Sequence, residues 1–300
     1  MTTMPEKTTM RGTLVRGIGS FYTARDEQGN EYTLRCKKKF RRERKTPLTG
    51  DEITFTPGSG EEHGWIETIL ERKNEFIRPP VANITQLVLV TAPVPETDWL
   101  LADRMIARAV GQGIRTVIAV NKSDLDPGMA DRVREEYRAA GIPVAGVSAR
   151  TGQGLEELRA LLQGEISCLA GQSGAGKSTL LNAMLGLDRE TGAISERINR
   201  GKNTTRTVEL LEKDGIRIMD TAGFNLLEPE KGLDPKDLKD RYPEFAPCEG
   251  KCRFRECLHD REPGCAVTAA AEEGRISRGR LERYRALLAE ARTEWENRYE

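Results

Sequence analysis

The chain has few aromatic residues, almost no histidine and no excess of either charge. Aromatic side chains make up 5% of its 300 residues, two histidines are present, and 47 Lys and Arg residues balance 47 Asp and Glu residues. A net charge of zero argues against a protein that coats nucleic acid indiscriminately. No uninterrupted apolar run approaches the roughly 20 residues that a membrane-spanning helix needs, and residues 1–10 lack the apolar core of a secretory signal. We therefore expect a cytoplasmic protein that does not enter a membrane.

Cysteine is scarce as well, but it is not evenly spread. Four of the six cysteines lie within residues 248–265, together with His259. In a reducing compartment such a cluster indicates a metal site before it indicates disulfides. Basic residues gather in another short stretch, which could face phosphates: Arg35, Lys37, Lys38, Lys39, Arg41, Arg42, Arg44 and Lys45.

The chain length exceeds that of one compact domain, and the pattern of residues changes twice along it. Residues 8–75 hold short β-like runs separated by glycines, which predicts a small β barrel. From Gln86 to Phe224, apolar strands alternate with amphipathic helices, as in a parallel sheet covered on both faces. The rest combines the cysteine cluster with a charged helical stretch at 277–300. The expected strands of the central part are 87–90, 116–120, 144–147, 166–170 and 216–219, and its expected helices are 98–110, 130–140, 155–162 and 177–185.

A glycine-rich loop connects the apolar run 166–170 to the next predicted helix. This strand, loop and helix context is what the P-loop pattern requires. The glycines let backbone N–H groups surround phosphate oxygens at a helix N-terminus, while Lys177 would neutralise the β- and γ-phosphates and Ser178 would bind magnesium. The alternative is a glycine-rich turn that matches by chance. The predicted phosphate-binding residues are Gly171, Gln172, Ser173, Gly174, Ala175, Gly176, Lys177, Ser178 and Thr179.

The segment 121–124, Asn-Lys-Ser-Asp, follows the predicted strand that ends at Val120. The carboxylate of Asp124 can accept from the ring N–H and the exocyclic amine of guanine, a donor pair that adenine lacks. Asn121 and Lys122 would brace the loop and cover the base. A polar turn that caps the next helix is the alternative, but Ser148, Ala149 and Arg150 supply a second base-side loop after the following strand. Together the two loops favour GTP over ATP.

Two further segments are candidates for the switches that sense the γ-phosphate. Asp220 to Gly223 matches the pattern DxxG at the end of a predicted strand, so Asp220 would hold magnesium and the Gly223 amide would sense the phosphate. Upstream, the polar segment 201–206 holds Thr205, our candidate magnesium ligand, with Thr204 as the alternative. A plain surface loop is the other interpretation of that segment.

The order of these motifs is that of a circularly permuted GTPase, since the base motif precedes the P-loop. Permutation places the second switch directly before the C-terminal segment, so phosphate sensing could move that segment. Phe224 stands where Ras-type enzymes have a glutamine that orients the attacking water. Phenylalanine cannot do this, and we expect slow intrinsic hydrolysis that needs help from a partner, an ion or another residue.

The cysteine cluster has the spacing of a zinc site. Cys252, Cys257, His259 and Cys265 offer three thiolates and one imidazole. Four such ligands complete a tetrahedral, structural site. Cys248 is a possible substitute ligand or a free thiol, and unligated buried cysteines are the alternative to a metal site.

Together these features resemble the ribosome small-subunit-dependent GTPase A family, also called RsgA or YjeQ. The motifs that carry the resemblance are Arg78-Pro79-Pro80-Val81-Ala82-Asn83, GQSGAGKS at 171–178, DTAGF at 220–224 and CRFRECLHDREPGC at 252–265. It implies an OB-fold barrel at residues 1–75, a permuted GTPase domain at 76–245 and a zinc-binding domain at 246–300. The chain departs from the family at Asn203, where histidine is usual, and at Ala222, where proline is usual, which puts a catalytic role for that histidine in doubt.

The resemblance further implies a monomer that binds GTP or GDP, Mg²⁺ and one Zn²⁺ and acts in late maturation of the small ribosomal subunit, which stimulates its GTPase activity. In an OB fold, the basic loop 37–45 could contact rRNA phosphates, and exposed aromatics could stack on bases. A solvated loop, with its aromatics in the core, is the alternative. The stacking candidates are Phe21, Tyr22, Tyr32 and Trp65. An RNA-binding assembly factor in which hydrolysis only resets binding is a second hypothesis, and a metabolic P-loop ATPase or kinase is a third.

Overall fold

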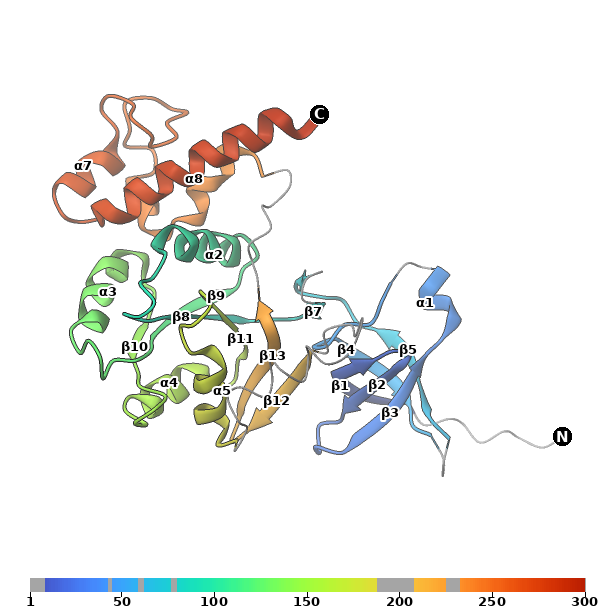
Figure 1. Cartoon of the computed structure of the whole chain (residues 1–300). Coiled ribbons are helices and arrows are strands. Elements are labelled where there is room, and N and C mark those ends of the chain that lie inside the picture. Colours follow the sequence, from blue (N-terminus) through green and yellow to red (C-terminus); the bar gives the residue numbers. More distant parts are fainter. Residues whose placement is uncertain are drawn as a thin grey trace. The chain divides into compact units, whose positions relative to one another are not determined.

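The computed structural model describes residues 9–42, 45–58, 62–76, 80–187, 208–224 and 233–299 (Figure 1). The chain divides into two compact units, each built from three stretches of sequence. The first unit comprises Met1–Ile84, Gln163–Cys168 and Arg189–Phe224, and the second comprises Thr85–Leu162, Leu169–Asp188 and Asn225–Glu300. Candidate switch residues Thr204 and Thr205 lie outside the described residues.

A closed five-stranded barrel forms the N-terminal part of the first unit. Each strand pairs with two others, in the cyclic order β1, β2, β3, β5, β4 and back to β1, and only the β3–β5 pair is parallel. Residues that alternate along the strands point inward, and Leu14, Leu34, Ile53, Phe55 and Ile66 are fully buried. The strands are β1 (Met10–Ile18), β2 (Phe21–Arg25), β3 (Glu31–Cys36), β4 (Glu52–Thr56) and β5 (Gly64–Ile69). The predicted barrel is therefore confirmed as an OB-like one.

The sequence predicted that the basic stretch 37–45 is a loop. This is wrong for part of it, because α1 (Lys38–Arg42) forms inside it. Straight-chain basic residues have high helix propensity, and Phe40 anchors the turn in the barrel core, where it is 3% exposed. The first unit also contains the short strands β6 (Glu75–Phe76) and β7 (Val81–Ala82) and the hairpin of β12 (Glu209–Lys213) and β13 (Ile216–Phe224).

The second unit contains the predicted parallel sheet. Strands β8 (Gln86–Thr91), β9 (Arg115–Val120) and β10 (Val144–Gly146) pair in parallel, with β9 in the middle. Strand β11 (Ile166–Ala170) spans the boundary of the two units, and its end leads into the P-loop. The helices α2 (Trp99–Gly111) and α3 (Met129–Tyr137) lie on one face of these strands, and α4 (Leu155–Leu162) and α5 (Lys177–Leu185) on the other (Figure 1).

The C-terminal segment, residues 233–299, packs against α2 and α3 within the same unit (Figure 1). It has little regular structure except for its long last helix, which buries Leu281, Tyr284 and Leu288. Its elements are the 3-10 helices η2 (Pro235–Arg241), η3 (Pro243–Cys248) and η4 (Asn297–Tyr299) and the helices α7 (Ala266–Glu272) and α8 (Arg278–Glu296); η1 (Arg138–Ala140) extends α3.

A buried ion network holds this segment to the sheet helices. Arg280 of α8 is 1% exposed and binds Asp103 of α2 and Glu244 of η3 at 2.5 and 2.7 Å. The rings of Tyr137 and Tyr242 lie 4.7 and 4.8 Å from its guanidinium carbon. The two carboxylates hold the pKa of Arg280 above its ordinary value despite burial, which opposes the charge. A buried charge is tolerated only when it is paired in this way.

Candidate functional site

The P-loop joins the end of β11 to the N-terminus of α5, as the sequence predicts. Three of its glycines have positive φ: Gly171 at 132°, Gly174 at 81° and Gly176 at 93°. A Cβ atom on Gly171 would lie 2.2 Å from the carbonyl oxygen of Val90, and one on Gly176 would lie 2.4 Å from Nδ2 of Asn121. Glycine is thus required both by the backbone conformation and by the close approach of the neighbouring loops.

The N-cap of α5 is Gly176, and no side chain of the described residues caps this end, so its first N–H groups are left for the loop. Lys177 is the first residue of this helix, and its Nζ donates to the carbonyl oxygens of Gly171 and Gln172 at 2.7 and 2.9 Å. Burial lowers the pKa of Lys177. A partly buried ammonium whose partners among the described residues are carbonyl oxygens is well placed to gain from an anion, because phosphate supplies the full negative charge that the carbonyls lack.

Asn121 fastens the base-side loop to the P-loop. Its side chain is 2% exposed; Nδ2 donates to the carbonyl oxygen of Ala175 at 3.0 Å, and Oδ1 accepts from the backbone N–H of Ala149 at 3.1 Å. One amide therefore connects three loops that are far apart in the sequence. Lys122 adds a second bridge, since its Nζ donates to the carbonyl oxygens of Val94 and Gly174 at 2.6 and 2.8 Å.

Asp124 is oriented by the second base-side loop. Ser148, which is fully buried, donates its hydroxyl to Oδ1 at 2.7 Å, and Arg150 donates Nη2 to Oδ2 at 2.6 Å. The Ser148 hydrogen bond, reinforced by the charge of Arg150, lowers the pKa of Asp124. An ionised carboxylate accepts hydrogen bonds only, as the N–H pair of guanine demands.

The structure also brings the predicted metal ligands together. The ligand atoms of Cys252, Cys257, His259 and Cys265 lie within 4.8 Å of one another, with Nδ1 of His259 3.6 Å from Sγ of Cys252 and 3.4 Å from Sγ of Cys265. A tetrahedral zinc ion with Zn–S and Zn–N bonds of about 2.3 and 2.0 Å separates such atoms by about 3.6 Å. The donor set and its spacing therefore fit one zinc ion. Cys248 is not part of this cluster, and its Sγ donates to the carbonyl oxygen of Ala266 at 3.6 Å.

The family models match the chain in two places. The RsgA GTPase model covers residues 69–230, and the RsgA N-terminal domain model covers residues 11–66. The chain belongs to the RsgA GTPase family. A small ribosomal subunit biogenesis GTPase RsgA of Caldanaerobacter subterraneus is 40% identical over 97% of this chain and 98% of its own length. That of Geobacillus thermodenitrificans is 41% identical over 93% of this chain and 96% of its own.

Two solved structures of similar proteins cover almost the whole chain. YjeQ from Thermotoga maritima superposes with a TM-score of 0.81 at 35% identity, over 95% of this chain and 99% of the other. YloQ, described as a circularly permuted GTPase, gives a TM-score of 0.79 at 29% identity, over 97% and 98%. The predicted family and the permuted order are thereby confirmed.

The second switch motif differs locally from the prediction. Strand β13 does not end before Asp220 but continues through it to Phe224. This RsgA-family chain thus holds Asp220 in the middle of a strand, paired with Glu209 of β12. The motif belongs to the first unit, whereas the P-loop and the base loops belong to the second. The assignments of Ser178, Thr205, Asp220 and Gly223 to magnesium and the γ-phosphate therefore stay predictions.

A third loop at the nucleotide site was not predicted. The segment 92–97 follows β8, and besides the Val94 contact with Lys122 it approaches Gly174 through Pro95. The N–H of Asp98 donates to Oε1 of Gln172 at 3.0 Å. The sequence held a signal, because Pro93 and Pro95 interrupt the chain between a buried strand and a helix. Such a loop lies at the carboxyl edge of the sheet, where ligands bind.

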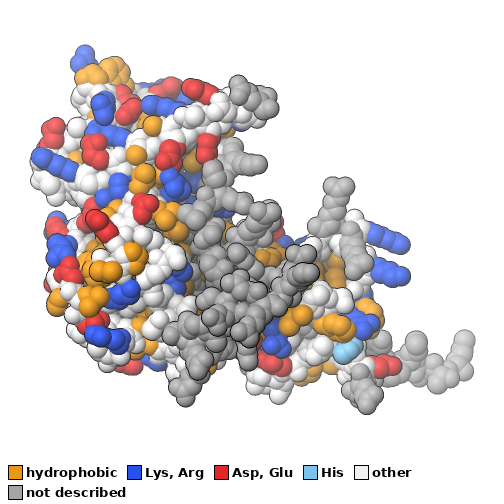
Figure 2. All heavy atoms as spheres, in the orientation of Figure 1, with side chains coloured by type: hydrophobic (Ala, Val, Ile, Leu, Met, Phe, Trp, Pro, Cys, Tyr) orange, Lys and Arg blue, Asp and Glu red, His pale blue; other side chains and the backbone are white. Residues whose placement is uncertain are grey.

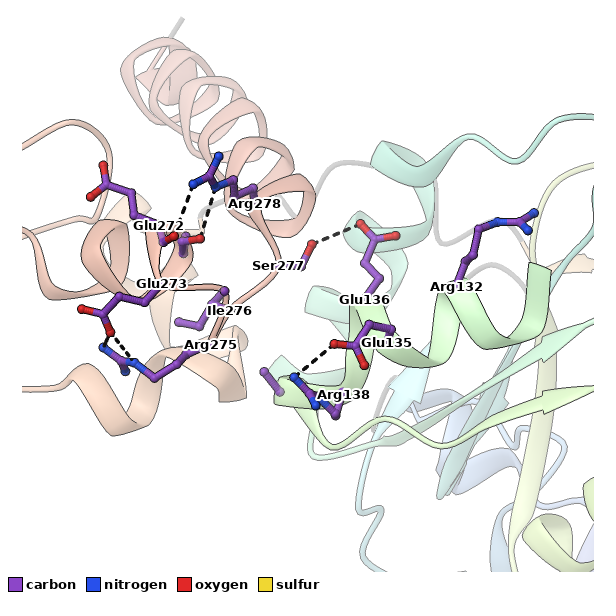
Figure 3. A pocket seen from close by; sticks show the side chains of 13 residues that line it. Arg132, Glu135, Glu136, Arg138, Glu272, Glu273, Arg275, Ile276, Ser277 and Arg278 are labelled. Atoms are coloured by element: carbon purple, nitrogen blue, oxygen red, sulfur yellow. Dashed lines mark hydrogen bonds and ion pairs between the residues drawn. The ribbon is translucent and has the colours of Figure 1, made fainter. Parts of the chain in front are cut away.

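Neither of two pockets in the second unit adjoins the P-loop. One, of about 490 Å³, lies between α3 and the turn from α7 to α8 (Figure 3). Among its charged residues, Arg138 pairs with Glu135 and Arg275 with Glu273, while Ser277 contacts Glu136. The other, of about 640 Å³, adjoins the cysteine cluster. Among the described residues, no helix is both long and apolar enough to cross a membrane.

Proposed function

We propose that the chain binds GTP with Mg²⁺ and hydrolyses it on the small ribosomal subunit during late maturation, in the cytoplasm and as a monomer. The names of its relatives support the ribosomal assignment. The observation that carries the nucleotide assignment is the Asn121 side chain, which ties the P-loop to both base-side loops. A loop that reads guanine must be fixed relative to the phosphates, because one nucleotide spans both.

The proposed roles follow from the chemistry of each side chain. Lys177 would stabilise the charge on the β- and γ-phosphates, and Ser178 and Thr205 would hold Mg²⁺, which would supply further positive charge there. Asp220 supports that ion and the Gly223 amide contacts the γ-phosphate. Because Phe224 offers no group that orients water, intrinsic turnover is slow and the subunit supplies the missing help.

The experiment is GTP turnover with and without purified small subunits. We expect strong stimulation by the subunit in wild type and its loss in Lys177→Ala. Stimulation that is absent in wild type would remove the ribosomal assignment and leave the GTPase assignment intact. Preference for ATP in direct competition would overturn both.

One face of the barrel carries side chains whose chemistry suits contact with rRNA. Phe21 of β2 pairs in register with Arg35 of β3, which in turn pairs with Trp65 of β5. The three side chains therefore form a row across neighbouring strands. Phe21 and Trp65 are 37% and 40% exposed, and the Arg35 guanidinium lies 4.7 Å from the Phe21 ring centre. Figure 2 shows hydrophobic and basic side chains next to each other on the barrel.

The other two aromatic candidates lie elsewhere. Tyr22 and Tyr32 pack against the barrel core, and the ring of Tyr32 lies 5.0 Å from that of Phe55. Flat, exposed rings stack on unpaired bases, and an arginine between them adds attraction for phosphate. We propose that Phe21, Arg35 and Trp65 contact rRNA, with the stretch 37–45 facing the phosphates.

Binding to small subunits across a salt series tests this surface. Phe21→Ala and Trp65→Ala should weaken binding without changing the salt slope, whereas Arg35→Ala should make the slope shallower. Ile18→Ala is the matched control, since Ile18 is 55% exposed on the same barrel but has no ring. Equal losses for Ile18 and Phe21 would contradict base stacking.

The alternative hypothesis is that hydrolysis only resets RNA binding. The kinetics of release from the small subunit distinguish it from the proposed GTPase function. If binding is the output, Lys177→Ala would lose nucleotide control of subunit binding while its nucleotide-free binding stays normal. Changes at Phe224 would then alter release more than binding.

A further inference from the structure

The carboxylate of Asp124 is held from two sides that differ in exposure. Ser148 binds Oδ1 from the interior, where its side chain has no exposed surface. Arg150 binds Oδ2 at 2.6 Å, and its side chain is 77% exposed while that of Asp124 is 15% exposed. The Arg150 bond therefore lies toward solvent, the direction from which a base must arrive.

A guanine needs both oxygens of this carboxylate. Its ring N–H and its 2-amino group donate side by side, one to each oxygen. Each carboxylate oxygen has two acceptor positions, so the interior bond from Ser148 leaves Oδ1 able to accept from the base. At Oδ2 the guanidinium already holds the exposed position.

We propose that Arg150 is a specificity-determining residue that competes with the 2-amino group of guanine for Oδ2 of Asp124. The proposal rests on the proposed reading of guanine by Asp124. Without a base, Arg150 keeps the carboxylate oriented; with guanine, the 2-amino group takes its place. Hypoxanthine lacks that amino group and leaves the pair intact. Arg150 therefore narrows the preference for guanine over hypoxanthine and promotes release of the guanine nucleotide.

The test compares GDP with inosine diphosphate, which differ only in the 2-amino group, in wild type and Arg150→Ala. Removing a positive charge weakens the attraction for both diphosphates alike, so the ratio of the two dissociation constants isolates the base. We expect the preference for GDP to rise about two- to fivefold in Arg150→Ala, the range of an exposed ion pair. The dissociation rate of GDP should fall relative to that of inosine diphosphate.

Salt provides a second measurement on the unaltered chain. Raising the ionic strength from about 0.05 to 0.5 M screens the exposed pair. The preference for GDP should therefore rise in wild type and stay flat in Arg150→Ala. Arg138→Ala is the matched control, because Arg138 is 66% exposed and pairs with Glu135 instead.

The outcomes are distinct. An unchanged or smaller preference for GDP in Arg150→Ala would overturn the role of Arg150, because the arginine would then either not compete or remain with the bound base. If wild type binds GDP no better than inosine or adenosine diphosphate, the reading of guanine by Asp124 fails, and the proposal fails with it.

Discussion

The N-terminal barrel and the C-terminal segment 233–299 are stabilised by different kinds of contact. The N-terminal barrel closes its sheet on itself, so that each strand has two partners and apolar side chains fill the centre. The C-terminal segment has no strand among its described residues 233–299. It holds instead a cluster of three thiols and one imidazole that fits a zinc ion, and a buried arginine. A short segment without a sheet gains stability from cross-links that a closed barrel does not require.

Metal removal tests this contrast most strongly. Chelation of zinc, or Cys257→Ala, should unfold much of segment 246–276 and leave the barrel folded, because binding of a structural zinc contributes about 10 kcal/mol or more to folding. Limited proteolysis followed by fragment mapping would locate the cleavage sites, and metal analysis should fall from one zinc per chain to none.

Cys248→Ser is the matched control, since Cys248 is buried beside the cluster but outside it. It should keep its zinc. Resistance to protease that persists after complete metal removal would show that this segment does not depend on the cluster.

The buried arginine gives the next largest expected effect. Arg280→Met leaves the buried carboxylate of Glu244 without its arginine, whereas Asp103 keeps Arg283 and the Tyr137 hydroxyl. Because a buried charge then lacks its partner, the free energy of unfolding should fall by about 3–5 kcal/mol. Urea denaturation of the zinc-loaded chain measures it. Arg104→Met is the control, because Arg104 joins the same helices, α2 and α8, through the exposed Glu290 and should cost under about 1 kcal/mol. Equal losses would mean that burial does not matter here.

The sequence predicted the elements that have a strong period or a strong motif. The helix 155–162 and the strand 166–170 were placed at the bounds that the structure shows. Strand β12 was missed because Glu209, Glu212 and Lys213 make it look like a polar loop. Its order comes from pairing with β13 and not from its own residues.

At the site, the sequence named the residues but not their contacts. The P-loop, Asn121 and Asp124 follow from local patterns, and so does the spacing of the zinc ligands. The Arg150–Asp124 and Lys122–Val94 contacts join positions 26 and 28 residues apart, and no pattern records them. The network around Arg280 spans 177 residues to Asp103. Only the folded chain brings such residues together.

A substitution that creates a cavity in the barrel tests whether the barrel is stable independently of the cysteine cluster. Leu34→Ala should lower the free energy of unfolding by about 2–5 kcal/mol, since Leu34 is fully buried and its removal leaves a cavity. The loss should be the same before and after zinc chelation if the barrel is independent of the cluster. Thermal or urea unfolding followed by the fluorescence of Trp65 reports on the barrel once Trp99 and Trp295, which lie in the second unit, are replaced by Phe. Ile18→Ala, on the exposed face, should change the free energy of unfolding little. A loss in Leu34→Ala that grows on chelation would show that the stability of the barrel depends on the cysteine cluster.

The smallest expected effect concerns the start of the last helix. Ser277 caps α8, because its Oγ accepts from the N–H of Arg280 at 3.2 Å, three residues on. Ser277→Ala removes this bond and should cost about 1 kcal/mol, and Ser277→Thr, which keeps the hydroxyl, should cost less. The same cap sets the position of Arg280 in the first turn of α8. The double variant Ser277→Ala/Arg280→Met should therefore lose less free energy of unfolding than the two single variants lose together. Once Arg280 is gone, the cap no longer positions a buried charge. Strict additivity in urea denaturation would show that the helix cap and the ion network stabilise the C-terminal segment independently.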